Sequence, residues 1–569
     1  MSLQRQGMQN LRLLFILLLS FFLSKCYTQE TFLHCISSQF SKSNITGVVY
    51  SPKSPTYSSI IDHAQKNPRW LNSSSAHPLF IIAPRKEFEL RPAILCSKIF
   101  GLQIRVLGGG HDYEGVSFRA ESPFVMIDMS NLDEINIDLE EETAWIQAGA
   151  TLGQLYYEIA KKSRLHAFPG GICFTTGSGG LISGGGLGSF IRKFGLAADN
   201  VINARVMDAN GRILDRKSMG EDFFWAIRGG GGASFGIILA WKLKLVHVPE
   251  KVSVFRVHRM LVGNTINLLQ QWQHTAHLLP KEFFLRMIMQ NDGAGKEKKV
   301  KVTFEALFLG TVSDLIPIVN QNFPEFNLEH KDFFQEPVIN CTEKPCLKKE
   351  CHEVPWIGSV LFLYNKGVNE SLEVLLDSSI PVYKNYFKGT SDFVKTPIPE
   401  NRWKMIERLF LEEDKPMIIL EPFGGRMDEI SESELPFPHR KGNLYNIQHL
   451  VNWDDNSESV SRKKIEWMRK FYMKMEPFVA NSPRTAYLNY RDLDFGTNQE
   501  DYSYSKAKIW GEKYFKGNFE RLAKVKSQVD PENFFRYQQS IPPFAITGLT
   551  NLVDERWASV YIPPELQLF

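Results

Sequence analysis

Two glycine-rich stretches constrain the fold of this 569-residue chain more than any other feature of its sequence. The first, Gly108 to Gly115, reads GGGHDYEG, and the second, Gly177 to Gly188, holds seven glycines in twelve residues. Glycine tolerates positive φ and close backbone approach, so such stretches can surround a phosphate with N–H groups. One stretch alone would indicate a tight structural turn. Two of them, each placed between expected strands, favour a nucleotide cofactor.

A histidine and a cysteine flank these stretches. His111 follows the first glycine triplet, and Cys173 lies just before the second stretch. A single histidine is more often structural, and a single cysteine is usually a small buried hydrophobe. Beside cofactor loops, however, both are nucleophilic enough to add to an oxidised isoalloxazine ring. We therefore expect a flavin site whose lining glycines are Gly108, Gly109, Gly110, Gly177, Gly179, Gly180, Gly184 and Gly185.

A third glycine run, Arg228 to Gly236, contains four consecutive glycines. It lacks the strand–turn–helix frame of a Rossmann dinucleotide site, because the residues from Ile237 onward have the pattern of a strand. The sequence also has no Walker-A motif. We therefore do not expect a Rossmann or P-loop domain.

The hydrophobic pattern predicts strands and helices around these loops. Val300–Leu309 alternates as an antiparallel strand does, Thr151 caps a helix that runs to Lys162, and Lys506–Val529 has the pattern of one long amphipathic helix. A further helix is expected at Leu90–Phe100, and further strands at Leu79–Ala83, Ile104–Leu107, Phe124–Asp128, Thr143–Ala148, Val201–Met207, Arg212–Leu214 and Ile237–Leu245.

The length of the chain and its net charge limit the number of domains and the kinds of partner that we expect. A chain of this length exceeds one compact core, so we expect two or more domains. Lysine and arginine total 66 against 63 aspartates and glutamates, which leaves a net charge of +3. A nucleic-acid-binding protein usually carries a basic face or run, so we expect no nucleic-acid partner. We expect a monomer that acts on a small molecule.

The N-terminus has the pattern of a secretory signal. Arg5 and Arg12 precede the apolar stretch Leu13–Leu23, which is too short to span a membrane, so residues 1–28 are expected to be a cleaved signal peptide. No later stretch is long and apolar enough to span a bilayer. Four glycosylation sequons agree with secretion, to the cell wall or the vacuole: Asn44, Asn72, Asn340 and Asn369.

Seven cysteines are present, and Cys26 is expected to leave with the signal. In an oxidising compartment the favoured disulfide is Cys35–Cys96, which ties the mature N-terminus to a helix. Cys341, Cys346 and Cys351 form an odd-numbered cluster, whose pairing stays open. A zinc site there, with His352 nearby, is the alternative. The secretory setting favours disulfides, however, and the spacing matches no common zinc pattern, so we expect no metal site in the chain.

Several segments together resemble a known family. Residues 105–115 (RVLGGGHDYEG) resemble the histidyl-flavin loop of the berberine bridge enzyme-like flavoproteins, and residues 169–173 (PGGIC) with the second glycine stretch resemble their cysteinyl-flavin loop. Further matches lie at residues 220–232, 436–440, 487–492 and 539–543. The resemblance covers nearly all of the mature chain. Cannabinoid synthases, reticuline oxidase and plant carbohydrate and monolignol oxidases belong to this family.

The resemblance implies an α+β fold related to vanillyl-alcohol oxidase. An FAD-binding PCMH-type domain would span residues 75–250, and residues 476–545 would complete it. A substrate domain with an antiparallel sheet would occupy residues 251–475, and residues 546–569 would form a tail. The resemblance also implies FAD bound covalently at two points, with His111 on the flavin 8α-methyl group and Cys173 on C6.

For catalysis the resemblance implies hydride transfer to the flavin and proton removal from the substrate. Tyr487 and Tyr490 match the active-site tyrosine motif, and one of them is expected to be the base. Because an unperturbed tyrosine has a pKa of about 10, that base needs a nearby positive group or the flavin itself. Gln448 falls at a polar catalytic or substrate-binding position, and Tyr113 near the substrate side of the flavin.

Some positions depart from the family pattern. Thr176 stands where relatives carry a small aliphatic residue that controls oxygen access. Phe174 replaces the usual proline, Leu181 the usual histidine, and Asn446 and His449 replace commoner residues near Gln448. We expect a secreted FAD-dependent oxidoreductase that acts on a specialised metabolite, phenolic alcohol or carbohydrate, with O2 as acceptor. A dehydrogenase with another acceptor, a flavin-containing cyclase and a non-catalytic flavin-binding protein are the alternatives. The retained His111, Cys173, Tyr487 and Tyr490 argue against the last of these.

Overall fold

The computed structural model describes residues 30–40, 45, 47–70, 77–263, 265–293, 295–334, 349–377, 385–498 and 501–544. Several of the features expected from the sequence lie outside these residues: the signal peptide, the tail, Asn44, Asn72, Asn340, Cys341 and Cys346. Asn369 is described and is exposed to solvent, as a glycosylated asparagine must be.

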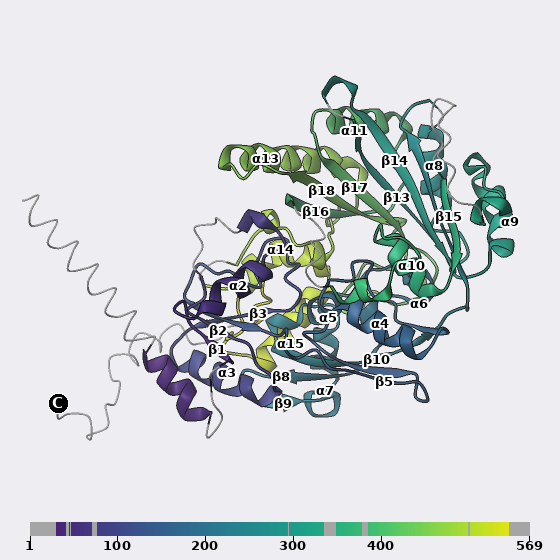
Figure 1. Ribbon diagram of the computed structural model, residues 1–569. Helices are drawn as coiled ribbons and strands as arrows, with labels where there is room; N and C mark the ends of the chain where they lie inside the picture. The colour runs from purple at the N-terminus through teal and green to yellow at the C-terminus, as the bar shows by residue number, and fades with distance from the viewer. Residues whose placement is uncertain are drawn as a thin grey trace, which may run out of the picture.

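A small sheet begins the described fold (Figure 1). Its order is β1-β2-β4-β3, in which β2, β4 and β3 are parallel and β1 is antiparallel to β2. One face packs on α3 and the other on α2, because alternate strand residues are apolar on both sides. The bounds are β1 Val49–Tyr50, β2 Phe80–Ile82, β3 Gln103–Leu107, β4 Phe124–Asp128, α2 Pro55–Ala64 and α3 Leu90–Ile99.

A second, antiparallel sheet follows with the order β5-β6-β10-β8-β9. Helix α4 packs on it and starts at a capping box, in which the Thr151 hydroxyl accepts from the Gln154 N–H at 3.3 Å and the Gln154 side chain accepts from the Thr151 N–H at 2.8 Å. The bounds are β5 Ile135–Asp138, β6 Thr143–Gln147, β8 Val201–Met207, β9 Ile213–Leu214, β10 Ile237–Lys244, α4 Leu152–Lys162, α5 Ser178–Ser183, α6 Ile191–Phe194 and α7 Arg216–Ile227, beside a two-stranded pair of β7 His166–Ala167 and β11 Val246–His247.

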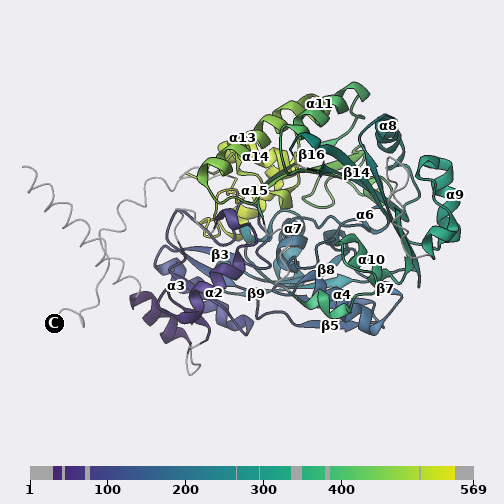
Figure 2. The same cartoon turned by 45° about the horizontal axis from the view of Figure 1, so that its top comes forward.

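A third, seven-stranded sheet is antiparallel throughout, with the order β15-β12-β14-β13-β17-β18-β16. Helices α8, α9, α11 and α13 cover its outer face (Figure 2). The alternation expected at Val300–Leu309 is confirmed in β14, because Val300, Val302, Phe304, Ala306 and Phe308 all pack beneath these helices. The strand bounds are β12 Val252–Met260, β13 Phe283–Asp292, β14 Lys299–Phe308, β15 Lys349–Val354, β16 Tyr386–Val394, β17 Pro416–Pro422 and β18 Tyr445–Trp453. The helix bounds are α8 Thr265–Thr275, α9 Val312–Asn322, α10 Trp356–Leu363, α11 Glu400–Leu411, α12 Arg426–Glu429 and α13 Glu458–Met475.

The C-terminal segment returns to the first two sheets. The predicted single helix Lys506–Val529 is wrong: α14 (Tyr504–Phe515) and α15 (Asn518–Val529) are separate helices. Lys516 ends α14 with a φ of 47°, a left-handed conformation that no α-helix continues through. Helix α15 then begins at Asn518 and packs beside α7. Residues 534–535 join the hydrophobic core that includes the first two sheets.

The other predicted elements are confirmed to within one or two residues at their ends. The antiparallel sheets and their helices make the protein α+β, as expected. The predicted disulfide is also present: Cys35, in a helix over residues 30–39, bonds to Cys96 of α3. Cys351 forms no disulfide with any described residue.

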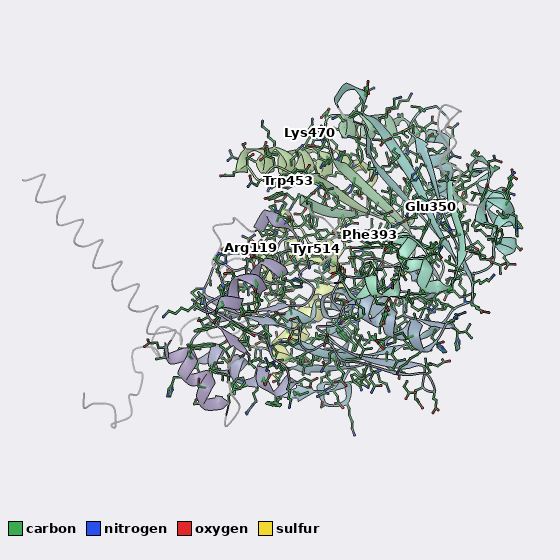
Figure 3. The ribbon with its side chains drawn as sticks, viewed as in Figure 1. Arg119, Glu350, Phe393, Trp453, Lys470 and Tyr514 are labelled. Carbon is green, nitrogen blue, oxygen red and sulfur yellow. A yellow bond between two sulfur atoms is a disulfide. The ribbon has the colours of Figure 1, made fainter. Side chains whose placement is uncertain are left out.

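The molecule has two halves: one contains the first two sheets and the C-terminal helices, and the other contains the seven-stranded sheet and its helices. An aromatic cluster fills the junction between them. Phe393 of β16 packs there against Phe437 and His439, and Figure 3 places Phe393 between the seven-stranded sheet and the part of the molecule below it. None of the helices in the described ranges is long and apolar enough to cross a membrane.

Candidate active site

A cavity of about 650 Å³ lies between the two halves of the molecule. The loops after β3 and before α5 line one part of it, and the inner face of the seven-stranded sheet lines another. This size falls in the range of small-molecule and cofactor sites. His111, Cys173, Thr176, Tyr113, Gln448, Tyr487 and Tyr490, all singled out from the sequence, line this one cavity.

The two glycine-rich loops touch each other at one end of the cavity. A Cβ added to Gly109 would lie 2.4 Å from the backbone nitrogen of Gly177, and one added to Gly177 would lie 2.5 Å from that of Gly109. Only glycine lets the two backbones approach this closely. The two loops therefore form one wall, and His111 and Cys173 both lie at this wall.

Most of the expected glycines line the cavity, with one exception. Gly108, Gly109, Gly110, Gly177, Gly179, Gly180 and Gly184 line it. Gly185 does not: it has a φ of 117° and packs against the Phe437 ring instead. Conversely, Gly231 and Gly232 of the third run, for which no cofactor role was predicted, do line the cavity.

His111 is held in one tautomer by Thr175. Its Nε2 lies 3.1 Å from the carbonyl oxygen of Thr175, and a carbonyl can only accept, so the proton is on Nε2 and the lone pair is on Nδ1. Burial, with a contribution from Lys66, lowers the pKa of His111 to about 4. The imidazole is therefore neutral at physiological pH, and Nδ1 is its nucleophilic atom.

Thr175 also connects His111 to Cys173. Its hydroxyl lies 3.1 Å from His111 Nε2 and 3.4 Å from Cys173 Sγ, so these two side chains meet at one buried group. Burial raises the pKa of Cys173, while hydrogen bonds from Thr175 and Thr176 oppose that shift. Lys66 lines the same end of the cavity and interacts electrostatically with both side chains. The sequence analysis did not identify Lys66 or Thr175.

The two motif tyrosines differ in their surroundings. The Tyr487 hydroxyl accepts hydrogen bonds from the Gly186 N–H at 2.9 Å, the Leu187 N–H at 3.2 Å and the Asn489 side chain at 2.8 Å. Burial nevertheless raises the pKa of Tyr487 to about 12. Its hydroxyl is thus committed to the loop after α5, so Tyr487 is placed to support that loop.

Tyr490 belongs to a group of side chains that face the cavity. Its ring stacks on Tyr113 with a centroid distance of 5.8 Å and meets Tyr487 edge-on at 5.0 Å. The Gln448 amide donates a short hydrogen bond to the Tyr113 hydroxyl. These contacts join three distant segments: the His111 loop, β18 and the C-terminal motif.

Charged groups on the inner face of the sheet were missed by the sequence analysis. Arg286 on β13 interacts electrostatically with Tyr490. Burial lowers the pKa of Arg286, but the nearby carboxylates of Glu305 and Glu421 outweigh burial and raise it. Glu421 on β17 lines the cavity, its pKa is raised by burial, and its Oε2 has no hydrogen-bond partner among the described residues. The one sequence feature that indicated such a group is the single charge of Arg286 among the apolar residues Phe283 to Met287.

Ion pairs fix the His111 loop to the C-terminal motif. Arg491 Nε donates to Asp112 Oδ2 at 3.0 Å. Lys388 of β16 is 4% exposed and bridges Glu114 at 2.6 Å and Asp492 at 2.5 Å. Buried charges of opposite sign held this closely position the loops that carry them.

The cavity suits a flavin nucleotide. Its glycine wall leaves open space, since a Cβ added at Gly180 would meet no atom within 4 Å. Gly231 has a φ of 85°, so a second loop also presents backbone without side chains to the cavity. Two nucleophilic atoms lie at the same wall, which is the donor set that covalent attachment of an isoalloxazine ring requires.

Comparison with known proteins agrees with this geometry. Residues 78–216 match the family model described as FAD binding domain, and residues 486–542 match the one described as Berberine and berberine like. Berberine bridge enzyme-like 22 of Arabidopsis thaliana is 46% identical over 548 residues, which cover 94% of this chain and 100% of that protein. The chain belongs to the berberine bridge enzyme-like family. It is therefore an FAD-dependent oxidoreductase that acts on small molecules.

Other family members show the range of reactions on this scaffold. Monolignol oxidoreductase AtBBE-like 13 of Arabidopsis thaliana is 45% identical over 85% of this chain and 87% of that protein. The solved structure of BBE-like #28 from Arabidopsis thaliana is 41% identical with a TM-score of 0.81, over 90% of this chain and 99% of that one. The grass pollen allergen Phl p 4 has a TM-score of 0.82 and 38% identity over 90% of this chain and 100% of that one. Its wild type is described as a glucose dehydrogenase, and a single-substitution variant as a glucose oxidase.

Proposed function

We propose that this protein oxidises a small phenolic alcohol to the carbonyl compound, with FAD bound covalently through His111 Nδ1 and Cys173 Sγ. The observation that carries the proposal is the single cavity that holds both attachment side chains and the Tyr113, Gln448 and Tyr490 group. When bound there, FAD supplies an acceptor for the hydride from the substrate carbon. We further propose O2 as the acceptor that restores it.

Tyr490 is the proposed base. It takes the proton of the substrate hydroxyl, and Arg286 assists because a nearby positive charge favours the ionised form of a phenol. Tyr487 is unsuited to this step, since three N–H donors already occupy its hydroxyl. Tyr487 instead supports the loop after α5 through its hydroxyl, and Tyr490 packs edge-on against the Tyr487 ring.

The sheet wall is proposed to orient the substrate. Tyr113, Tyr490 and Phe387 present aromatic rings to the cavity, and Ile288, Met417 and Ile419 present aliphatic side chains. The three rings provide flat apolar faces against which an aromatic substrate packs, beside the charged groups of Arg286 and Glu421. The Oε2 of Glu421, which has no hydrogen-bond partner within the described ranges, is placed to accept a hydrogen bond from a second hydroxyl.

One relative supports a phenolic alcohol as the substrate, and an experiment is needed to identify the electron acceptor. The monolignol oxidoreductase is named for phenolic alcohols, whereas Phl p 4 is described with glucose. The secreted protein would be incubated with p-hydroxycinnamyl alcohols and with glucose, in air and under nitrogen with an artificial acceptor. Turnover of the alcohols in air supports the proposal. Turnover only with the artificial acceptor supports a dehydrogenase, and turnover of glucose alone contradicts the substrate class.

Localisation is proposed from the same features. The Cys35–Cys96 disulfide and the exposed Asn369 sequon agree with the secretory pathway. We propose that residues 1–28 are removed as a signal peptide and that the mature protein works in the cell wall. Microscopy of a C-terminal fluorescent fusion in plasmolysed plant cells separates the wall from the vacuole.

A further inference from the structure

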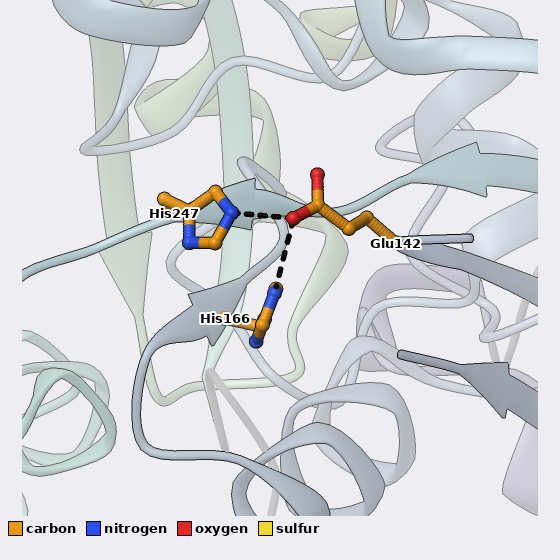
Figure 4. A group of neighbouring side chains, drawn as sticks. All are labelled: Glu142, His166 and His247. Atoms are coloured by element: carbon orange, nitrogen blue, oxygen red, sulfur yellow. Dashed lines mark hydrogen bonds and ion pairs between the residues drawn. The ribbon is translucent and has the colours of Figure 1, made fainter. Parts of the chain in front are cut away.

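Three side chains with metal-binding atoms meet away from the cavity, at a turn of the five-stranded sheet. One oxygen of the Glu142 carboxylate reaches both His166 and His247 (Figure 4), with Oε1 2.5 Å from His247 Nε2 and 3.6 Å from His166 Nε2. One ligand atom from each residue lies within 4.8 Å of the other two. We propose that Glu142, His166 and His247 form a zinc site.

The backbone holds these three residues together before any metal binds. His166 and His247 are directly opposite each other in the antiparallel pair β7–β11. The Leu245 N–H donates to the carbonyl of Glu142 at 2.8 Å, which ties the β5–β6 turn to the strand that carries His247. The site is therefore built from hydrogen-bonded segments, which lowers the entropic cost of assembling the ligands.

His166 points its Nε2 toward the Glu142 carboxylate. Its Nδ1 lies 2.8 Å from the Ser163 hydroxyl, which also accepts from the Leu165 N–H at 3.1 Å. His166 Nε2 is buried and forms no hydrogen bond with any described residue, because Glu142 Oε1 is too distant for one. A cation between these two atoms would satisfy both. Metal-binding histidines commonly have the other ring nitrogen hydrogen-bonded, as His166 has through Ser163.

The charges around the turn favour a cation. Within the described part of the chain, Glu142 pairs with these two histidines and with no lysine or arginine. Asp138, Glu140 and Glu141 lie in the same turn and add negative charge. No basic side chain therefore competes with a metal for the carboxylate.

Two imidazoles and one carboxylate are a ligand set that zinc takes with water in the fourth position. Tetrahedral ligands bound at about 2.0–2.1 Å lie about 3.3 Å apart, near the spacing of His166 and Glu142. His247 would move outward by about 1 Å to reach this geometry. Its side chain is 67% exposed, so it has room to do so. Zinc there would fasten the β5–β6 turn to β7 and β11.

The test uses the flavin-loaded, full-length secreted protein after chelator treatment and dialysis. Zn²⁺ is added in competition with a chromophoric zinc indicator, and bound metal is counted by elemental analysis. We expect one equivalent of zinc and a higher thermal midpoint with zinc than without it. His247→Ala and Glu142→Gln should lose that equivalent, and Ser163→Ala should weaken binding by about 10–100-fold.

His274→Ala is the matched control, because His274 is an exposed histidine on α8 outside the cluster. It should bind zinc as the wild type does. The proposal is overturned if the wild type binds no equivalent of zinc, or if His247→Ala and Glu142→Gln bind it with wild-type affinity. Unchanged flavin absorbance in each variant shows that the fold is intact.

Discussion

The ring of Tyr113 stacks on the ring of Tyr490 with an interplanar angle of 11°, although 377 positions separate them in the chain. Tyr113 lies two residues after His111, so this contact places the proposed base directly beside the proposed flavin attachment loop. Buried ion pairs hold the same two segments, through Arg491 with Asp112 and through Lys388 with Glu114 and Asp492. These contacts hold the proposed base and the proposed attachment site in a fixed position relative to each other.

Replacing Tyr490 with phenylalanine should remove the base and leave the cavity shape intact. We expect kcat to fall by roughly a hundredfold to ten-thousandfold, which is the usual contribution of a general base. The rate of flavin reduction in anaerobic stopped flow measures this directly. Tyr487→Phe is the comparison: it should cost about 1–3 kcal/mol of stability, because buried N–H groups lose their acceptor, with a smaller effect on flavin reduction. A larger rate loss in Tyr487→Phe would reverse the two roles.

Glu421→Gln tests the sheet wall. Loss of a charged acceptor for a substrate hydroxyl should lower kcat/KM by about 10–100-fold, equivalent to 1.5–3 kcal/mol. Because burial raises the pKa of Glu421, its carboxylate is neutralised as the pH falls through that raised value. The wild-type kcat/KM should therefore decline toward acid pH, and Glu421→Gln should flatten that limb. An unchanged acid limb in the variant would remove Glu421 from substrate binding.

Lys388→Met should destabilise the protein, because Lys388 does not itself line the cavity but joins the His111 loop to the C-terminal motif. It leaves the buried carboxylates of Glu114 and Asp492 without their shared cation, at a cost of about 3–5 kcal/mol. Lys470→Met is the control: Lys470 lies on the outer surface of α13 (Figure 3) and pairs with an exposed Glu412, a contact worth about 1 kcal/mol or less. Thermal midpoints compare the two variants. Equal midpoints would show that the buried cluster contributes no more than a surface pair.

Thr176 tests control of oxygen access. It lines the cavity three residues after Cys173, and Thr176→Ile adds bulk at the proposed path to the flavin. Reoxidation of the reduced protein by O2 should slow by about tenfold, which corresponds to ~1.4 kcal/mol in the barrier. Thr176→Val, which keeps the volume, should reoxidise at nearly the wild-type rate. If both variants reoxidise like the wild type, oxygen reaches the flavin by another path.

Local motifs indicated which loops line the cavity. His111, Cys173 and most of the glycines line the cavity, because each lies within a short stretch whose sequence fixes its backbone. Gly185 does not line the cavity, because the sequence does not distinguish a glycine that faces the cavity from one that packs on Phe437. Helices α14 and α15 were merged because the apolar period continues on both sides of Lys516 and Gly517.

Features made by long-range packing were not predictable. Arg286 and Glu421 meet only when β13 and β17 pair, and their strands otherwise have ordinary apolar patterns. Likewise, Glu142, His166 and His247 have no recognisable spacing in the sequence. They converge because β7 pairs with β11 and the β5–β6 turn bonds to residue 245. The prediction of no metal site rests on the spacing of Cys341, Cys346 and Cys351.

The most direct test of covalent attachment is the intact mass of the denatured protein. The wild type, His111→Ala and Cys173→Ala should each carry the mass of one FAD, whereas the double variant should carry none. Cys351→Ala, which removes a buried thiol outside the cavity, should carry FAD as the wild type does. Release of FAD from the denatured wild type, or its retention by the double variant, would contradict the account.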